Sequence, residues 1–273
     1  MPTPTPSDTL VRRHPERPTT WSFEPSERRV RGLVDDVALV DSREPILVWE
    51  PRHKVPEYGF PVADVRTDLL EATDTAPADG LYYRPRRPVR QWFHARVGDR
   101  LIEHAAWQWD VPGLEDYLGV TWFPGVLDGW LEEDEPVITH PRDPNVRVDA
   151  LASDRHVVVR HGGRVVAESR RPVAVFETGL PTRWYLPVED VDLDALTVSD
   201  TWSECPYKGR TTGYWSLGPD LPDVAWSYAT PFPAVGAIAG RIAFYSEKVE
   251  VVVDGVRITP PTHPAPTAPQ ETP

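Results

Sequence analysis

The chain has 273 residues, 40% of them hydrophobic and 26% charged, which is ordinary for a globular protein and long enough for two domains. Its formal net charge of -13 argues against a nucleic-acid partner, because such binding depends on Lys and Arg neutralising phosphates. No apolar stretch approaches the roughly 18 residues that cross a bilayer, and the single cysteine, Cys205, excludes an internal disulfide. We therefore expect a cytoplasmic protein with no membrane partner.

The two ends of the chain differ in composition from the rest. Residues 1–20 and 260–273 are rich in proline and nearly free of apolar residues, which predicts a disordered N-terminal arm and a disordered Pro-rich tail. Between them we expect a first domain over residues 21–135, a linker over 136–146 and a second domain over 147–259. Three prolines and few packing residues between Pro136 and Pro144 favour the linker.

The two domains are diverged copies of one sequence. Residues 28–50 align with residues 155–177 without a gap, so that Ser42 meets Ser169 and Glu50 meets Glu177. Later blocks keep the same order: residues 58–61 with 184–187, Asp64 with Asp190, residues 106–107 with 225–226, and residues 119–123 with 240–244. A series of ordered matches indicates an internal duplication.

Short apolar segments with a period of two recur in the second copy, which predicts strands. Gly162-Gly163 and Asp254-Gly255 separate neighbouring segments, and Asp35-Asp36 holds the matching place in the first copy; all three dipeptides suit tight hairpins. We therefore predict two tandem all-β domains with little helix, each a curled antiparallel sheet or open barrel. The segments are residues 157–159, 164–167, 173–176, 242–246, 249–253 and 256–258.

Features found in only one copy are the candidates for function, because shared features are expected to build the scaffold. The block Cys205-Pro206-Tyr207-Lys208-Gly209 has no counterpart in the first copy, which has Ala-Pro-Ala-Asp-Gly at residues 76–80. The second such feature is Tyr228, where the first copy has Trp109.

This block carries possible chemistry at Cys205, Lys208 and Tyr228. A nearby ammonium favours the thiolate, which is the nucleophilic form of cysteine, and a phenol can donate a proton. The structural alternative is that the cysteine is a small buried hydrophobe, the lysine faces solvent and Tyr228 belongs to the core. The candidate ligand contacts around these three residues are Arg171, Tyr185, Tyr207 and Trp226.

Other polar residues give weaker signals. Glu177 and Asp190 occur in both copies, which favours a structural role. Arg171 replaces Glu44 of the first copy, so we expect it to join Lys208 in a small cationic pocket. The eight histidines are scattered and one cysteine cannot form a thiolate site, so the sequence predicts neither a metal site nor a cofactor.

Several blocks of the second copy resemble domain-of-unknown-function family 427 in its bacterial two-domain form. The most specific is Cys205 to Gly209, and the first copy, which lacks it, matches only in outline. The resemblance implies a compact β-fold of the tent or open-barrel kind, similar in architecture to methionine-sulfoxide reductase B, with no established activity. A nucleotidyltransferase label is sometimes attached to the family, but the sequence shows no paired metal-binding carboxylates or Gly-Ser phosphate loop. The other blocks are residues 167–170, 176–177, 184–187, 225–228 and 243–245.

Three hypotheses of function stay open at this point. The first is a module that binds a small, anionic or carbonyl-bearing molecule in the second domain. The second is an enzyme that uses Cys205 as a nucleophile or redox thiol activated by Lys208. The third is a structural or regulatory tandem without catalysis. The sequence does not identify a ligand or an oligomeric state.

Overall fold

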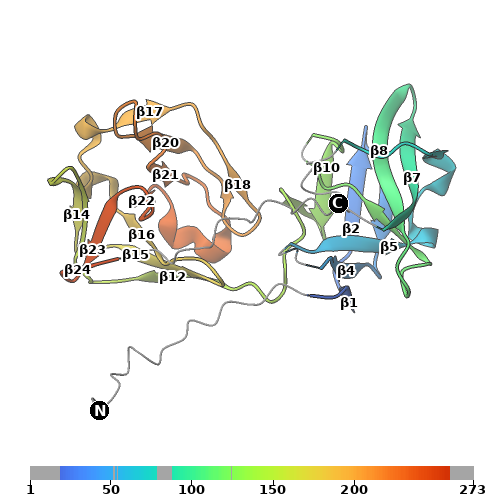
Figure 1. The fold of residues 1–273 in the computed structure, drawn as a ribbon, viewed down its shortest axis with the longest axis horizontal. Coiled ribbons are helices and arrows are strands. Elements are labelled where there is room, and N and C mark those ends of the chain that lie inside the picture. Colours follow the sequence, from blue (N-terminus) through green and yellow to red (C-terminus); the bar gives the residue numbers. More distant parts are fainter. Residues whose placement is uncertain (1–18, 52, 54, 79–87, 124, 259–273) are drawn as a thin grey trace, which may run out of the picture. The chain divides into compact units, whose positions relative to one another are not determined.

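The computed structural model describes residues 19–258 apart from 52, 54, 79–87 and 124, so the expected arm and tail fall almost wholly outside the described residues (Figure 1). The chain divides into two compact units between Asn145 and Val146. In the described part, no helix is long and apolar enough to span a membrane.

The first unit contains two antiparallel sheets. The larger has the order β1 (Ser22–Pro25), β4 (Ile46–Trp49), β5 (Glu57–Pro61), β9 (Tyr117–Val120), β8 (Arg100–Trp109), β7 (Val89–Val97), β6 (Leu70–Thr73). The smaller has the order β11 (Glu135–Val137), β10 (Gly129–Glu132), β2 (Val30–Val34), β3 (Val37–Ser42). The short 3-10 helices η1 (Val62–Asp64) and η2 (Thr67–Leu69) follow β5.

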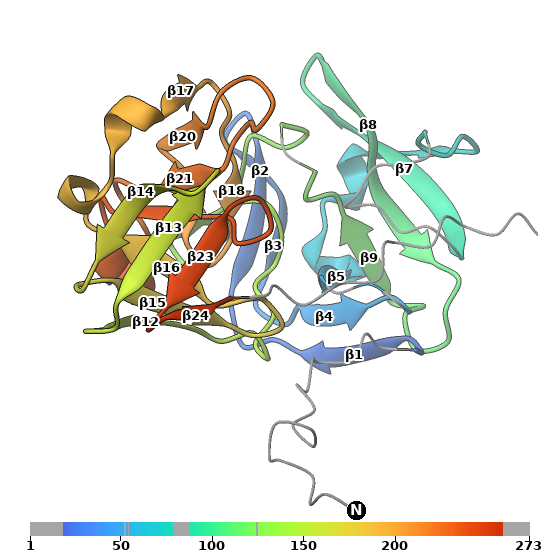
Figure 2. The ribbon, with the colours of Figure 1, turned by 60° about the vertical axis from the view of Figure 1, so that its left-hand side comes forward.

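The second unit repeats this plan, and its smaller sheet is seen face-on in Figure 2. The larger sheet has the order β12 (Val148–Ala152), β15 (Val173–Glu177), β16 (Arg183–Leu186), β22 (Ile242–Phe244), β21 (Ala225–Ser227), β20 (Gly213–Ser216), β17 (Thr197–Ser199). The smaller has the order β14 (Arg164–Ser169), β13 (Val157–His161), β23 (Glu250–Val253), β24 (Val256–Arg257). A third sheet pairs β18 (Glu204–Cys205) with β19 (Gly209–Arg210), and the 3-10 helices are η3 (Val188–Asp190), η4 (Leu193–Ala195) and η5 (Pro233–Ile238).

The shared strand order confirms the predicted all-β tandem, and none of the sheets closes on itself. The hairpin turns behave as predicted. Both residues of Asp35-Asp36, of Gly162-Gly163 and of Asp254-Gly255 have positive φ angles. Positive φ at both central positions is typical of the type I′ turn, whose twist matches that of the flanking strands.

One part of the sequence alignment is wrong by three residues. Gly59 pairs with Gly119 across β5 and β9, while Tyr185 pairs with Ala243 across β16 and β22. Because Gly59 and Tyr185 are matched positions, Gly119 corresponds to Ala243 rather than to Gly240. In the second copy the connection between β21 and β22 is longer, because it contains η5. The Gly and Phe residues that the two sequences share here therefore match by chance and stand at different positions in the two sheets.

The linker also begins later than its prolines suggest. Residues Glu135–Val137 form β11 and pair with β10, so Pro136 and Val137 belong to the first unit's smaller sheet. Pro136 is tolerated because β11 is an edge strand, where a missing backbone donor costs little.

Each larger sheet buries both of its faces. In the second unit, Ala174, Trp184 and Leu186 pack in the core shared with β13 and β23 of the smaller sheet. Their strand neighbours Val175 and Tyr185 point the other way, because side chains alternate along a strand. This opposite face, which we call the aromatic face, is built with Tyr214, Trp226, Tyr228, and Val235 and Ile238 of η5. Figure 1 shows η5 as the orange coil beside β12 and β16.

Candidate functional site

The block Cys205 to Gly209 forms a tight hairpin over the aromatic face. Cys205 pairs with Gly209, and the Lys208 N–H donates to the Cys205 carbonyl at 3.2 Å across the turn. Gly209 has a φ of +105°, a backbone conformation that glycine adopts far more readily than other residues. The Phe232 N–H donates to the Lys208 carbonyl at 3.0 Å, which ties the hairpin to the segment that begins η5. This local geometry turns the Lys208 side chain inward.

Lys208 forms a buried ion pair with Glu177. The Lys208 Nζ and the Glu177 Oε2 are 2.5 Å apart, and the two side chains are only 11% and 10% exposed. Glu177 is the last residue of β15, so the hairpin places its cation at the end of a strand that lies between β12 and β16. Such a pair needs good geometry, since removing two charges from water is expensive.

Cys205 lies in the same cluster. Burial lowers the pKa of Lys208, but the charge of Cys205, the carboxylate of Glu177 and hydrogen bonds to both outweigh it, so that the pKa of Lys208 is raised above its ordinary value. Lys208 is therefore a permanent ammonium at neutral pH. The half-buried Cys205 is close enough to this cation to contribute to the shift in its pKa.

Two buried tyrosines border the thiol. Burial, and the nearby charges of Cys205 and Glu177, raise the pKa of Tyr228, and burial raises the pKa of Tyr185 although a hydrogen bond from Trp226 opposes it. The Trp226 Nε1 donates to the Tyr185 hydroxyl at 3.0 Å. Both phenols therefore remain protonated donors across the physiological pH range.

A second ring of polar contacts surrounds Trp226. Its ring lies 4.2 Å from that of Tyr245 between centroids, and the Arg183 guanidinium carbon stands 5.7 Å from the Trp226 ring centroid. Arg183 is in turn paired with Glu247 at 2.7 Å. The Tyr214 hydroxyl is 2.7 Å from the Ser203 hydroxyl, which precedes the hairpin. These contacts hold the aromatic face in place around Lys208 and its neighbours Glu177, Cys205, Tyr185 and Tyr228, which we call the Lys208 cluster.

The structure thus brings five of the seven sequence-selected residues into one neighbourhood: Cys205, Lys208, Tyr185, Trp226 and Tyr228. Tyr207 is half-buried in the turn of the hairpin. The expectation for Arg171 is wrong. Its exposed guanidinium lies 3.1 Å from both Glu189 and Asp190, because these carboxylates of η3 are the nearest counter-charges to its strand end.

Sequence reasoning missed Glu177, which the duplication marked as scaffold. The matched Glu50 of the first copy is also buried, but its neighbours include the carboxylate of Glu57 and the His53 ring, whose Nε2 is 3.8 Å from the Glu50 Oε2. The repeat therefore conserves the carboxylate while changing its partner. The other carboxylate that the two copies share, Asp190 in the second and Asp64 in the first, accepts the same hydrogen bond in both. The Ser169 hydroxyl donates to Asp190 at 2.7 Å, just as that of Ser42 donates to Asp64 at 2.6 Å.

The first copy has different residues at the matched positions of its larger sheet. Gly59 stands for Tyr185 and Trp109 for Tyr228, whereas Trp107 matches Trp226. With a glycine and an indole in place of these two phenols, this face has fewer hydroxyl groups and packs as a second core.

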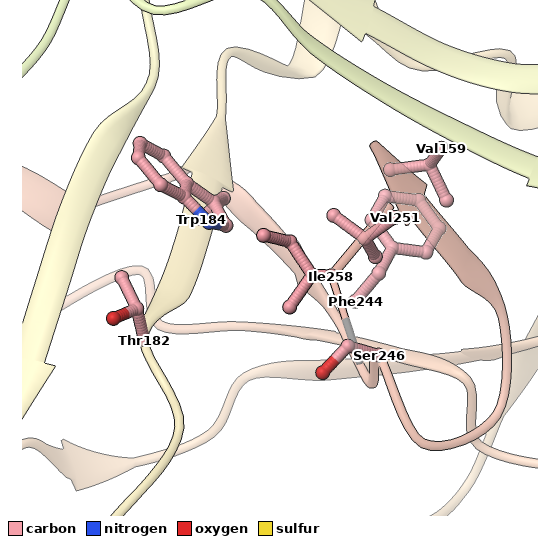
Figure 3. Close-up of a pocket in the computed structure, with 7 residues that line it drawn as sticks. All are labelled: Val159, Thr182, Trp184, Phe244, Ser246, Val251 and Ile258. Carbon is pink, nitrogen blue, oxygen red and sulfur yellow. The ribbon is translucent and has the colours of Figure 1, made fainter. Parts of the chain in front are cut away.

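No metal centre is evident in the part of the chain that the structure describes, where no three His, Cys, Asp or Glu side chains gather. The Lys208 cluster itself is closely packed. A small pocket lies on the other face of the same sheet, lined by residues that include Trp184 and Phe244 (Figure 3). Chemically, the cluster offers one cation, one thiol and two neutral phenols.

The comparisons with known proteins agree with the duplicated architecture. The family model described as domain of unknown function (DUF427) matches residues 22–132 and again residues 149–255. The chain belongs to this family. Each DUF427 region coincides with one of the two units, and only the second carries the Lys208 cluster. A comparison with curated proteins finds no match.

Proposed function

We propose that the second DUF427 region binds a small molecule with a carbonyl or anionic group at the Lys208 cluster, by which we mean Glu177, Lys208, Cys205, Tyr185 and Tyr228. The observation that carries this proposal is the Lys208–Glu177 pair, about nine-tenths buried beneath the hairpin formed by residues 205–209, a sequence block that the first copy lacks. A hydrophobic pair of similar volume would hold such a hairpin at least as well. The buried cation is therefore better explained by ligand recognition than by stability.

The donors around the cation suit an oxygen-bearing ligand. An ammonium has three N–H donors, of which one is donated to Glu177 and another can face the nearby Cys205. The third can meet a ligand oxygen, and the protonated phenols of Tyr185 and Tyr228 can donate to the same molecule. The ring of Trp226 supplies an apolar wall beside them.

Entry of a ligand requires the hairpin to move, because the cluster is closely packed. The hairpin is suited to this, since β18 and β19 pair only with each other and belong to neither large sheet. The backbone hydrogen bond from Phe232 to Lys208 ties it to the rest of the unit, whereas that from Thr211 to Ser203 at 2.9 Å lies within the hairpin itself. Segments with so few ties open at low free-energy cost.

A thermal-shift titration of the full chain tests the proposal, with acetate, inorganic phosphate and pyruvate as probes. We expect at least one probe to raise the melting temperature of the wild type and not that of Lys208→Met, which keeps the apolar stem and removes the charge. The matched control is Lys248→Met, which also removes one ammonium; Lys248 donates to the carbonyls of Pro222 and Asp223 and lies 5.3 Å from the Tyr245 ring centroid. Equal shifts in all three proteins, or no shift with any probe, would contradict the proposal.

Enzymatic use of Cys205 is the second candidate, and the electrostatic interaction between Cys205 and the nearby Lys208 ammonium favours it. A thiolate beside a cation is a competent nucleophile. The test is the rate of alkylation by iodoacetamide, in which the Cys205 sulfur forms a bond to carbon and iodide leaves. Rapid reaction well below about pH 8.5, slowed in Lys208→Met, supports this candidate; reaction only above that pH excludes it.

If both experiments fail, the structural or regulatory tandem is the hypothesis left. A cytoplasmic location remains part of the proposal and rests on the single cysteine. Cell fractionation with an antibody against the full chain would test it.

A further inference from the structure

We propose that residues 259–266, which come shortly after β24, lie across an exposed apolar patch of the second unit formed by Leu151 and Phe176. The two side chains are 56% and 45% exposed. Ala174, a core residue of the larger sheet, pairs with Leu151 and stands two residues before Phe176, so the exposed pair are diagonal neighbours on one face. That face is opposite the Lys208 cluster, so the proposal does not depend on the function proposed above. The disorder expected of the Pro-rich tail would begin only after this segment.

In the first unit the position of Phe176 is contacted by the segment that follows β11. Trp49 matches Phe176 in the ungapped alignment of the two copies, and the pairings of β4 and β15 have the same register. Trp49 is only 8% exposed, and its Nε1 donates to the Asp143 Oδ2 at 3.1 Å. Pro141 of the same segment is buried. The chain that leaves the smaller sheet of the first unit therefore packs against the residue at this position.

The equivalent segment of the second unit begins at Ile258. Val137 pairs with Trp130 in the first unit, and the Ile258 N–H donates to the Val251 carbonyl at 2.8 Å in the second. Trp130 and Val251 are matched positions, because both pair with matched residues of β2 and β13. The chain after Ile258 is therefore the counterpart of the segment after Val137 that contacts Trp49.

Ile258 also places the start of this segment beside the patch. It lines the same small pocket as Thr182, and both are seen in Figure 3. Thr182 stands opposite Phe176 when the pairing of Val175 with Arg183 is continued by one residue. The chain therefore leaves the described part of the second unit next to the patch.

The sequence of the segment suits this position. The tripeptide Thr-His-Pro occurs at residues 139–141 and again at 262–264, beginning two residues after Val137 and four after Ile258. Six residues lead from Val137 to Asp143, whereas fifteen residues follow Ile258, so the chain is long enough. A Pro-rich segment is already extended before it docks on an aromatic surface, so it loses little conformational entropy.

The two sides of the contact differ together between the copies. In the first copy Asp143 accepts a hydrogen bond from an indole. Phe176 has no N–H to donate, and residues 259–270 contain no Asp or Glu. Leu151 stands where the first copy has Glu24, so the second patch is also less polar. An uncharged Pro-rich segment therefore fits the second patch as a charged one fits the first.

Photo-cross-linking identifies what contacts the patch. Phe176→p-benzoylphenylalanine in the purified full chain is irradiated at low protein concentration, and the cross-linked peptides are mapped by mass spectrometry. We expect cross-links within one chain to residues 259–266. The control is Val198→p-benzoylphenylalanine, on β17 at the opposite edge of the same sheet, which should not reach that segment. Cross-links to a second copy, or none to residues 259–266, would overturn the proposal.

Nuclear relaxation of the ¹⁵N-labelled full chain measures whether the segment is held. The heteronuclear NOE of the His263 amide should match that of the described loops in the wild type, and should fall to the value of Thr272 in Phe176→Ser and in Leu151→Glu. Leu151→Glu puts the first copy's residue at an exposed position, so the unit should stay folded. Val198→Ser, on a residue that is 74% exposed, should change nothing. Equal mobility of His263 and Thr272 in the wild type, or no response to either patch variant, would contradict docking.

Discussion

Tyr185 occupies in the second copy the strand position that Gly59 occupies in the first. Tyr185 pairs with Val173 and Gly59 pairs with Ile46, at the same register of two equivalent sheets. A Cβ at Gly59 would lie 2.9 Å from the Ile46 side chain, so the first copy has no room for a larger residue there without repacking. The phenol that borders Cys205 therefore has no counterpart in the first unit. The two copies differ in chemistry because they differ in what this face can accommodate.

Replacing Tyr185 by Phe should destabilise the second unit by about 1–3 kcal/mol, because the buried Trp226 Nε1 would lose its acceptor. Urea unfolding followed by tryptophan fluorescence measures the change. A double-mutant cycle with Trp226→Phe provides the control, since removing both partners leaves no unpaired donor. Additive effects of the two substitutions would show that the hydrogen bond does not contribute.

Breaking the Lys208–Glu177 pair should lower the free energy of unfolding of the second unit more than loss of the Tyr185–Trp226 hydrogen bond does. Either Lys208→Met or Glu177→Gln leaves one charge buried without its partner, for which losses of about 3–5 kcal/mol are typical. The combination Lys208→Met with Glu177→Leu should recover most of that stability. Arg66→Ala, which breaks the exposed pair with Asp68, should cost less than about 1 kcal/mol. A double variant no more stable than the singles would contradict the pairing.

The buried phenols should ionise late. Burial raises the pKa values of Tyr185 and Tyr228, so the absorbance rise at 295 nm near about pH 10 should be unchanged when both are replaced by Phe. In urea, where every tyrosine is exposed, the same double variant should lose amplitude in proportion to two of nine tyrosines. Loss of amplitude near pH 10 in the folded protein would contradict their burial.

Glu57 predicts a pH-dependent effect in the first unit. Burial, and then the neighbouring Glu50, raise the pKa of Glu57 well above its ordinary value. A carboxyl group with a raised folded-state pKa favours folding at acidic pH, and this contribution is lost as pH rises through that pKa. Glu57→Gln should therefore raise the melting temperature at about pH 8, with a gain that shrinks towards about pH 4. A gain that does not change with pH would contradict this account.

The fold could be predicted from the sequence because its signals are local. The turns at Gly162-Gly163 and Asp254-Gly255 need only their own residues to adopt positive φ. The short apolar runs that open β13 and β15 are typical of strands buried on both faces, and along β15 Val173 and Val175 enter one core while Ala174 enters the other. The register of β22 could not be predicted, because the connection through η5 has no equal in the first copy and its length decides which residue meets Tyr185.

The site was only partly predictable for a related reason. Comparison of the copies identifies residues that differ, such as Cys205 and Tyr228, but it conceals a shared residue whose partner has changed, as at Glu177. Arg171 was misplaced because charge alone does not say which carboxylate is nearest; η3 puts Glu189 and Asp190 beside it. Such pairings depend on tertiary packing between segments that are distant in the chain.

The central claim is that the Lys208 cluster holds a ligand, and Cys205 is a natural reporter because it is the only cysteine. The most direct measurement is the rate at which iodoacetamide alkylates Cys205 in the full chain, with and without acetate, phosphate or pyruvate at saturating concentration. The account predicts that a bound probe slows alkylation of the wild type severalfold and does not protect Cys205 in Lys208→Met. Alkylation at the same rate with and without every probe would contradict it.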